Sequence, residues 1–454
     1  MINKLFKNRY FLISLQFLTL SGFVLLVYGG IGITTNDKDF AKILRNTNLS
    51  NLIVWSYWWP IIIATAILFG RFWCSICPME LVTSFFGKIG LRKKPGRFLK
   101  SGWVITLFYM VILVIGIHTL AIHRIPQYMA IYMLSLLLVA VVAGLIWEKR
   151  TFCTHICPVG HLLGLYSMVA SRELRVKDAA VCRDCKTKDC ISKSNHYKLT
   201  GRSCTSELFP PKIEDNRACI LCGQCHKSCT KDNIVIRKRK PAADLFNNVK
   251  LSWAEMGFFA MVSGFVIYEV LSEWKVSKKF VMAVPDWINR SLNITGSPAG
   301  TVKALVLFIL LPVVFYSLFA LLKRVSAKEE WKTSFNQLVL AILPVTASMH
   351  LLKALLKTTS RIPYWDFVFG DPNGVSTAQM LMEHPEMLNR GILSVLWPYI
   401  GIIAVLLSAA GLVLSFLIIK KQPFRNTASK VISTVAVALY GGLFFVSLTA
   451  WRLF

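Results

Sequence analysis

Residues 70–78, GRFWCSICP, and residues 149–158, KRTFCTHICP, repeat one pattern, in which a long apolar run ends in two closely spaced cysteines and a proline. Each copy follows roughly 20 mainly apolar residues, the length with which an α-helix crosses a bilayer core of ~30 Å. A proline directly after the second cysteine suits the first turn of a new helix. The repeat therefore predicts two helical hairpins that present Cys74 and Cys77, and Cys153 and Cys157, at the same membrane surface.

The composition extends this prediction to the whole chain. Of the 454 residues, 55% are hydrophobic and only 17% are charged, whereas a soluble chain usually carries about 25% charged residues. A single soluble globule is thus excluded, and so is a disordered chain. Nine apolar runs are long enough to span a membrane, and we expect them near Tyr10–Ile33, Leu52–Gly70, Trp103–Ile122, Tyr128–Trp147, Trp253–Leu271, Val302–Leu322, Phe335–Leu356, Ile392–Ile419 and Val431–Trp451. The first run is too long for the core of a signal peptide, which predicts an uncleaved first span.

Basic residues set the expected orientation. The chain has 52 Lys and Arg against 23 Asp and Glu, a net charge of +29. Loops rich in Lys and Arg stay on the cytoplasmic side, and most of these residues fall inside when the N-terminus is placed there. The sequence therefore predicts a multi-pass protein of the inner (cytoplasmic) membrane, with a cytoplasmic N-terminus and a periplasmic C-terminus. Trp55, Trp58 and Trp59 would then anchor the outer interface.

Three parts follow from this pattern. Residues 1–175 should form a four-span membrane domain with the twin Cys-Pro motifs, and residues 176–240 a polar, cysteine-rich domain on the cytoplasmic side. Residues 241–454 should form a five-span membrane domain with two outer loops. The predicted fold class is mainly α, a polytopic helical bundle of about nine spans with a small α+β insert.

Eight of the twelve cysteines lie in the insert, and their spacing predicts metal clusters. Cys219-x2-Cys222-x2-Cys225-x3-Cys229 is the spacing of bacterial ferredoxins, in which three thiolates hold one [4Fe–4S] cluster and the fourth reaches the other. We therefore predict two [4Fe–4S] clusters, one held by Cys182, Cys185, Cys190 and Cys229 and one by Cys219, Cys222, Cys225 and Cys204. Two zinc ions usually use separated Cys-x2-Cys pairs, and a reducing compartment disfavours disulfides.

The four remaining cysteines, Cys74, Cys77, Cys153 and Cys157, form a possible third metal centre. Four thiolates suit an iron–sulfur cluster, zinc or Cu(I), and two pairs could also act as a redox-active dithiol. Free thiols that pack at helix starts are the alternative. The spacing does not separate these options.

The insert is basic, with 15 Lys and Arg against 7 Asp and Glu between Val176 and Lys240. This charge fits anionic lipid headgroups or a cytoplasmic acidic electron carrier. No nucleic acid partner is expected, because aromatic residues do not alternate with the basic ones.

Ionisable residues within spans are costly and mark functional candidates. Five such residues are His118, His123, Glu269, His350 and Lys353. Histidines on facing helices could ligate a b-type haem, and a histidine beside a carboxylate could move protons for quinol oxidation. The alternative is snorkelling to the interface or a hydrogen bond within the bundle.

With its twin Cys-Pro motifs and the two-cluster insert that follows them, the chain resembles the membrane polyferredoxins of the NapH and NosR type over about residues 1–245. It departs from them at Cys74-x2-Cys77, where three intervening residues are usual, and at Thr230, where proline is usual. The resemblance implies an electron-transfer component, of a quinol dehydrogenase kind, that links the quinone pool or a cytoplasmic donor to a periplasmic reductase or its maturation. A copper-reducing or assembly factor and a redox-switched transporter or sensor are the alternatives.

Overall fold

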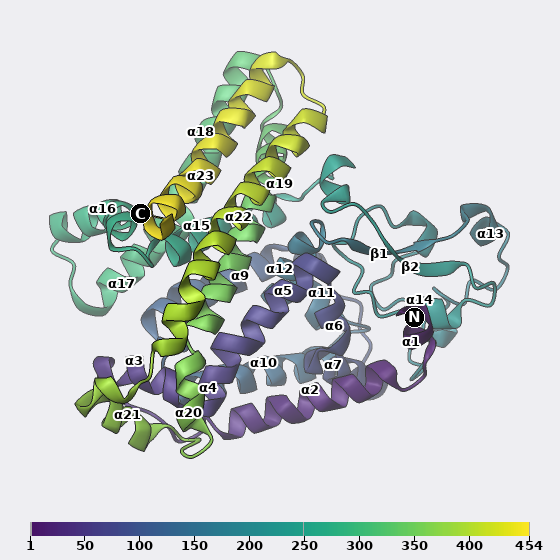
Figure 1. Ribbon diagram of the computed structural model, residues 1–454. Helices are drawn as coiled ribbons and strands as arrows, with labels where there is room; N and C mark the ends of the chain where they lie inside the picture. Colours follow the sequence, from purple (N-terminus) through teal and green to yellow (C-terminus); the bar gives the residue numbers. More distant parts are fainter. Residues whose placement is uncertain (1, 248, 454) are drawn as a thin grey trace. The chain divides into compact units, whose positions relative to one another are not determined.

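The computed structural model describes residues 2–247 and 249–453 (Figure 1). The chain divides into two compact units. Unit 1 consists of Met1–Tyr28, Ala64–Ile105 and Ile131–Asp244. Unit 2 consists of Gly29–Ile63, Thr106–Ala130 and Leu245–Phe454. The cysteine-rich insert thus belongs to the same unit as the twin Cys-Pro motifs.

The predicted helical membrane fold is confirmed. Within the described residues, eight helical segments are long and apolar enough to cross a membrane: Phe11–Tyr28, Leu49–Phe69, Pro126–Ile146, Trp253–Leu271, Pro298–Ala327, Trp331–Val368, Gly391–Lys421 and Thr427–Trp451. The one expected span that is not among these eight, Trp103–Ile122, corresponds to a shorter apolar helix, Trp103–Thr119. Its second half is a π-helix, η2 (Ile112–Thr119), which follows α9 (Trp103–Val111).

In both hairpins of unit 1, the second cysteine caps the helix that follows it. Cys77 precedes α7 (Pro78–Ile89) and Cys157 precedes α12 (Pro158–Ser167), both with extended backbone. Proline is tolerated at a first helical position because an N–H there would have no partner within the helix. The first cysteine of each pair lies in a short helix, α6 (Phe72–Ile76) or α11 (Thr151–His155). The local structure therefore repeats as the sequence does.

A two-stranded antiparallel sheet joins the two ends of the insert. Strand β1 (Arg172–Val176) pairs with β2 (Ile234–Lys238), and the register runs from Arg172 opposite Lys238 to Val176 opposite Ile234. Between the strands the chain forms only short elements, namely α13 (Ala179–Arg183), η3 (Lys193–Asn195), η4 (Pro210–Lys212) and α14 (Gln224–Ser228). The N-terminal helix α1 (Ile2–Lys7) adds Phe6 to a small core with Leu174, Leu221, Ile234 and Ile236.

Unit 2 is built around α19 (Trp331–Thr359), most of whose residues are buried. It packs against α15 (Trp253–Leu271), α18 (Leu311–Ala327), α22 (Gly391–Lys421) and α23 (Thr427–Leu453). The long helices α22 and α23 run side by side (Figure 1). Besides η2, this unit contains the helices α3 (Lys38–Thr47), α4 (Leu49–Ile53), η1 (Val54–Trp58), α16 (Lys275–Ser291), α17 (Gly296–Leu305), η6 (Val306–Leu310), η7 (Ile362–Tyr364), α20 (Trp365–Val368), α21 (Val375–Glu383) and η8 (Pro385–Met387).

Two loops of unit 2 pack together as a cap at one end of this unit. Thr47, at the end of α3, donates its hydroxyl to the carbonyl oxygen of Gly374 at 2.7 Å, and the N–H of Leu49 donates to Pro372 at 3.0 Å. Gly374 has a φ of +74°, and a Cβ there would lie 2.3 Å from the backbone nitrogen of Asn48. Both the backbone conformation and the close approach require glycine.

Candidate metal centres and an intramembrane polar cluster

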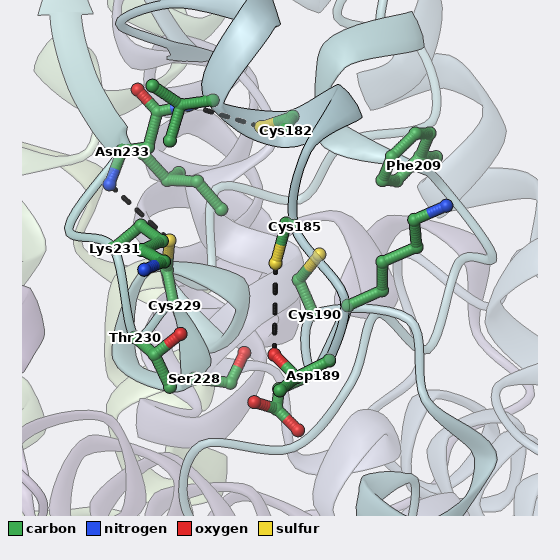
Figure 2. Close-up of a pocket in the computed structure, with 14 residues that line it drawn as sticks. Cys182, Cys185, Asp189, Cys190, Phe209, Ser228, Cys229, Thr230, Lys231 and Asn233 are labelled. Carbon is green, nitrogen blue, oxygen red and sulfur yellow. Dashed lines mark hydrogen bonds between the residues drawn. The ribbon is translucent and has the colours of Figure 1, made fainter.

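The first group of insert cysteines surrounds one pocket of unit 1. Cys182, Cys185, Cys190 and Cys229 all line it (Figure 2). Cys182 lies on α13 and Cys229 directly follows α14. The structure thus brings together the four cysteines that the sequence analysis assigns to one cluster, and we name this group site I.

The sulfur atoms of site I receive hydrogen bonds from the surrounding chain. Asn233 donates its side-chain amide to Cys182 at 3.1 Å and its backbone N–H to Cys229 at 3.4 Å (Figure 2). Hydrogen bonds from the backbone of Lys188 and the hydroxyl of Thr187 hold the pKa of the Cys185 thiol below its ordinary value. Hydrogen bonds of this kind orient thiolate ligands and tune the potential of a cluster.

The second group, site II, consists of Cys204, Cys219, Cys222 and Cys225. Cys219 and Cys225 are each 8% exposed, and burial together with the other three cysteines raises the pKa of Cys225 well above its ordinary value. The loop turns at Leu221 and Gly223, which have φ angles of +54° and +63°. Cys190 of site I also interacts electrostatically with Cys225, so the two sites are neighbours.

The four cysteines of the twin motifs also come together, and we name them site III. Burial raises the pKa of Cys77, and Cys153, Cys157 and Cys74 add to the shift. The pKa of Cys157 rises to about 12 for the same reasons, although the N–H of Gly160 donates to its sulfur at 3.3 Å. A bound metal centre lowers such pKa values by stabilising the thiolates.

Two buried arginines join the hairpins of unit 1, and the sequence analysis missed them. Arg150, 2% exposed, is the N-cap of α11, and its Nε lies 3.6 Å from Glu80 on α7 of the other hairpin. Arg71, the N-cap of α6, lies against α12, where a Cβ on Gly160 would be 3.2 Å from its Nη2. Each arginine stands three residues before the first cysteine of its motif. That spacing was the signal available in the sequence.

A hydrogen-bonded carboxylate holds Arg150 in place. Glu80 is 1% exposed and accepts from Gln16 at 2.6 Å, from Ser84 at 3.0 Å and from Arg202 at 2.5 Å. Burial alone would raise the pKa of Glu80, but Arg202 and Arg150 outweigh it, and the pKa lies below its ordinary value. The carboxylate is therefore ionised at neutral pH.

The arginines also fit a negatively charged group at site III. Arg150 interacts electrostatically with Cys153, Cys74 and Cys222, and Arg71 with Cys157. The Nε and Nη2 atoms of Arg150 have no hydrogen-bond partner in the part of the chain that the structure describes, and neither has the Nε of Arg71. Arginine can only donate hydrogen bonds, so these atoms suit the acceptor sulfurs of a thiolate-bound cluster. The electrostatic interaction of Arg150 with Cys222 indicates that sites II and III are neighbours as well.

In unit 2, the five ionisable residues predicted within spans gather around Glu269. Its carboxylate lies 3.2 Å from Lys353 Nζ, which also donates to the Glu269 carbonyl oxygen at 2.9 Å. His118, His123 and His350 each interact electrostatically with Glu269. Their roles in binding haem or quinone stay predictions.

In residues 2–247 and 249–453, no three His, Cys, Asp or Glu side chains converge as ligands of a single metal ion.

Comparison with known proteins gives one match. A sequence model of a family described as a 4Fe-4S binding domain matches residues 51–97 and 129–177. The two matched stretches are the twin hairpins, with Cys74, Cys77, Cys153 and Cys157. No curated protein and no solved structure matches the chain. The chain thus has eight helical segments long and apolar enough to cross a membrane in its described part, and two stretches that are similar to a 4Fe-4S binding domain.

Proposed function

We propose that the protein transfers electrons in a membrane by means of iron–sulfur clusters. The observation that carries the proposal is the 4Fe-4S family match on the two hairpins whose cysteines and arginines the structure brings together. Sites I and II would hold two [4Fe–4S] clusters, in line with their ferredoxin spacing. Site III would hold a third.

The donor sets of the three sites support this assignment. Each site offers four cysteine thiols, and a [4Fe–4S] cluster bound by four thiolates takes up and gives back one electron at a time. Asn233 and Thr187 would stabilise the sulfurs of site I by hydrogen bonding, and Arg150 and Arg71 would offset negative charge at site III. The proximity indicated by the electrostatic interactions of Cys190 with Cys225 and of Cys222 with Arg150 supports passage of electrons among the sites of unit 1.

The electron partners belong to the same proposal. The distribution of Lys and Arg supports an inner-membrane protein with the clusters on the cytoplasmic side, and the basic insert supports docking of an acidic electron carrier. Quinone or a b-type haem would bind near His350, His118, His123, Glu269 and Lys353. The acceptor would be a periplasmic redox protein, as in the NapH and NosR type of membrane protein.

Reconstitution in liposomes tests this function. Anaerobically purified protein is mixed with a reduced quinol, and the visible absorption of the clusters is followed over time. We expect the absorption to bleach in the wild type, and to bleach less in a Glu269→Gln, His350→Ala double variant that retains its iron. Clusters that dithionite reduces but neither quinol nor a reduced acidic ferredoxin can reduce would contradict the proposed donors.

A further inference from the structure

Unit 2 contains a group of positively charged side chains, none of which forms an ion pair with a carboxylate in the described chain. This cationic cluster consists of Arg45, Arg124, Lys357 and Arg361. Arg45 interacts electrostatically with Arg361 and Arg124, and Lys357 interacts with Arg45 and Arg361. Burial and these two arginines lower the pKa of Arg45 to about 10. Like charges at close range repel, so the arrangement is unfavourable without a counter-charge.

The nearby carboxylates are already engaged. Glu269 and Glu273 both form ion pairs with Lys353. In the described ranges, 2–247 and 249–453, no ion pair joins any residue of the cationic cluster to an Asp or Glu side chain. Glu269 attracts Lys357 and Arg45 electrostatically, and Glu273 attracts Arg361, so the chain offsets the positive charge of the cluster only in part.

Several buried N–H groups around the cluster lack an acceptor among the residues that the structure describes. They are Nε of Arg45, Nε of Arg361 and Nε1 of Trp55. Arginine and the tryptophan indole can only donate hydrogen bonds, and a buried donor without an acceptor is costly. The missing partner is thus an acceptor.

His123 adds a further donor. Arg124 Nε donates to His123 Nε2 at 3.2 Å, which assigns the proton of the neutral ring to Nδ1. Burial, Lys357, Arg124 and Arg45 lower the pKa of His123 well below its ordinary value, so the ring is neutral. Its Nδ1 is buried and has no acceptor in the described chain.

These side chains are held in place by the surrounding chain. Asn51, which is fully buried, donates to the carbonyl oxygen of Arg45 at 3.1 Å and to that of His123 at 3.5 Å. The ammonium group of Lys357 lies 5.7 Å from the ring centre of Trp55, and the rings of Trp55 and His123 are 6.4 Å apart. Helix α3, which carries Arg45, is fixed by the cap at Gly374. The donors therefore form a built site, not a set of mobile surface residues.

We propose that the cationic cluster binds a small oxyanion, a phosphate-type group with several acceptor oxygens and a negative charge. Four of the five unpartnered buried atoms at this site are donors, and the Oδ1 of Asn51 is the one acceptor among them, which disfavours a metal ion. A neutral quinone offers two carbonyl acceptors and leaves the positive charges unbalanced. The group can belong to a free anion or to the headgroup of an anionic phospholipid. This site goes beyond the electron-transfer function and does not depend on it.

Equilibrium binding of radiolabelled inorganic phosphate to the full-length protein tests the proposal. The protein is purified in a neutral maltoside detergent, and chloride keeps the ionic strength constant because exposed charges are screened by salt. We expect saturable binding to the wild type that is at least tenfold weaker in Arg45→Gln, Arg361→Gln and Lys357→Gln. Lys332→Gln and Lys430→Gln, which remove exposed lysines of the same unit, serve as matched controls and should bind as the wild type does. Monodisperse elution and unchanged iron content show that each variant is folded.

The same variants distinguish the source of the phosphate group. If free phosphate does not bind, but phosphatidylglycerol co-purifies with the wild type and is lost from Arg45→Gln and Arg361→Gln, the ligand is a lipid headgroup and the proposal stands. Two results would overturn it. One is equal binding of phosphate and lipid by the wild type and the three variants. The other is a water-soluble quinone analogue that binds through Arg45 and Arg361 where neither phosphate nor lipid does.

Discussion

Units 1 and 2 both bury positive charge, but they balance it differently. In unit 1, Arg150 and Arg202 face the ionised Glu80, and Arg150 also faces the thiols of sites II and III. In unit 2, Lys323 is balanced by Glu329 at 3.1 Å, whereas the cationic cluster has no such partner in the described chain. The comparison suggests that a buried cation paired with a carboxylate of the chain has a structural or tuning role, whereas a group of buried cations without ion pairs indicates a bound anion.

The largest expected effect is loss of a cluster in unit 1. Cys219→Ala removes a buried ligand of site II, and we expect the iron content to fall by about four atoms per chain. The neighbouring substitution Ile220→Val leaves every thiol in place and should retain the iron. Metal analysis of the two variants after anaerobic purification makes the comparison. Unchanged iron in Cys219→Ala would refute site II as assigned.

Gly374→Ala should be the most disruptive single change in unit 2. An added Cβ would lie 2.3 Å from backbone atoms of Asn48 and Thr47, and alanine disfavours a φ of +74°. We expect a loss of about 2–3 kcal/mol in unfolding free energy, seen as a lower Tm, together with weaker phosphate binding. Gly442→Ala, where a Cβ would meet nothing within 4 Å, is the matched control. Its Tm should stay the same or rise, since alanine favours a helix.

Arg150→Met sharpens the comparison because it removes one of the charges that unit 1 balances. Reduction adds negative charge to a cluster, so loss of a nearby cation should make the midpoint potential of a neighbouring cluster more negative. A shift of some tens of mV is expected, where 59 mV is a tenfold change for one electron. Potentiometric EPR titration measures it, and Arg150→Lys should recover much of the shift. The exposed Arg97→Met should have no effect, and an equal shift there would contradict the role of Arg150.

The smallest effect is expected at the exposed Asp232, which pairs with Lys7 at 2.7 Å and with Lys177 at 3.4 Å. Hydrogen bonds and charge from these lysines lower the pKa of its carboxyl. A lowered folded-state pKa gives stability that is present above the unfolded pKa of about 3.9 and is lost as the pH falls through the folded value. Asp232→Asn should therefore lower the Tm slightly at pH 7. The difference from the wild type should shrink as the pH falls below the unfolded pKa and vanish once the pH lies well below the folded pKa. A difference that does not change with pH would show that the pair is not its cause.

Much of unit 1 could be predicted because its determinants are local in sequence. Apolar length marked the spans, and cysteine spacing selected the two groups that the structure brings together in the insert, although their ligand roles stay predictions. Arg71 and Arg150 each interact with the other hairpin, and this could not be predicted because it depends on how two segments about 80 residues apart pack.

Unit 2 was less predictable for the same physical reason. His118, His123, Glu269, His350 and Lys353 stand out as ionisable residues in apolar runs, and the structure gathers them. The cationic cluster, in contrast, combines residues from three separate stretches, and Arg45 and Arg361 both lie outside the predicted spans. Trp55 was expected only as an interfacial anchor, yet its indole borders the cluster.

Iron and acid-labile sulfide content, measured together with the EPR spectrum of the reduced protein, tests the central claim most directly. Three four-iron clusters predict about twelve irons and about twelve sulfides per chain, falling to about eight of each in a Cys74→Ala, Cys153→Ala double variant. A colourless protein that contains zinc and no labile sulfide would contradict the claim.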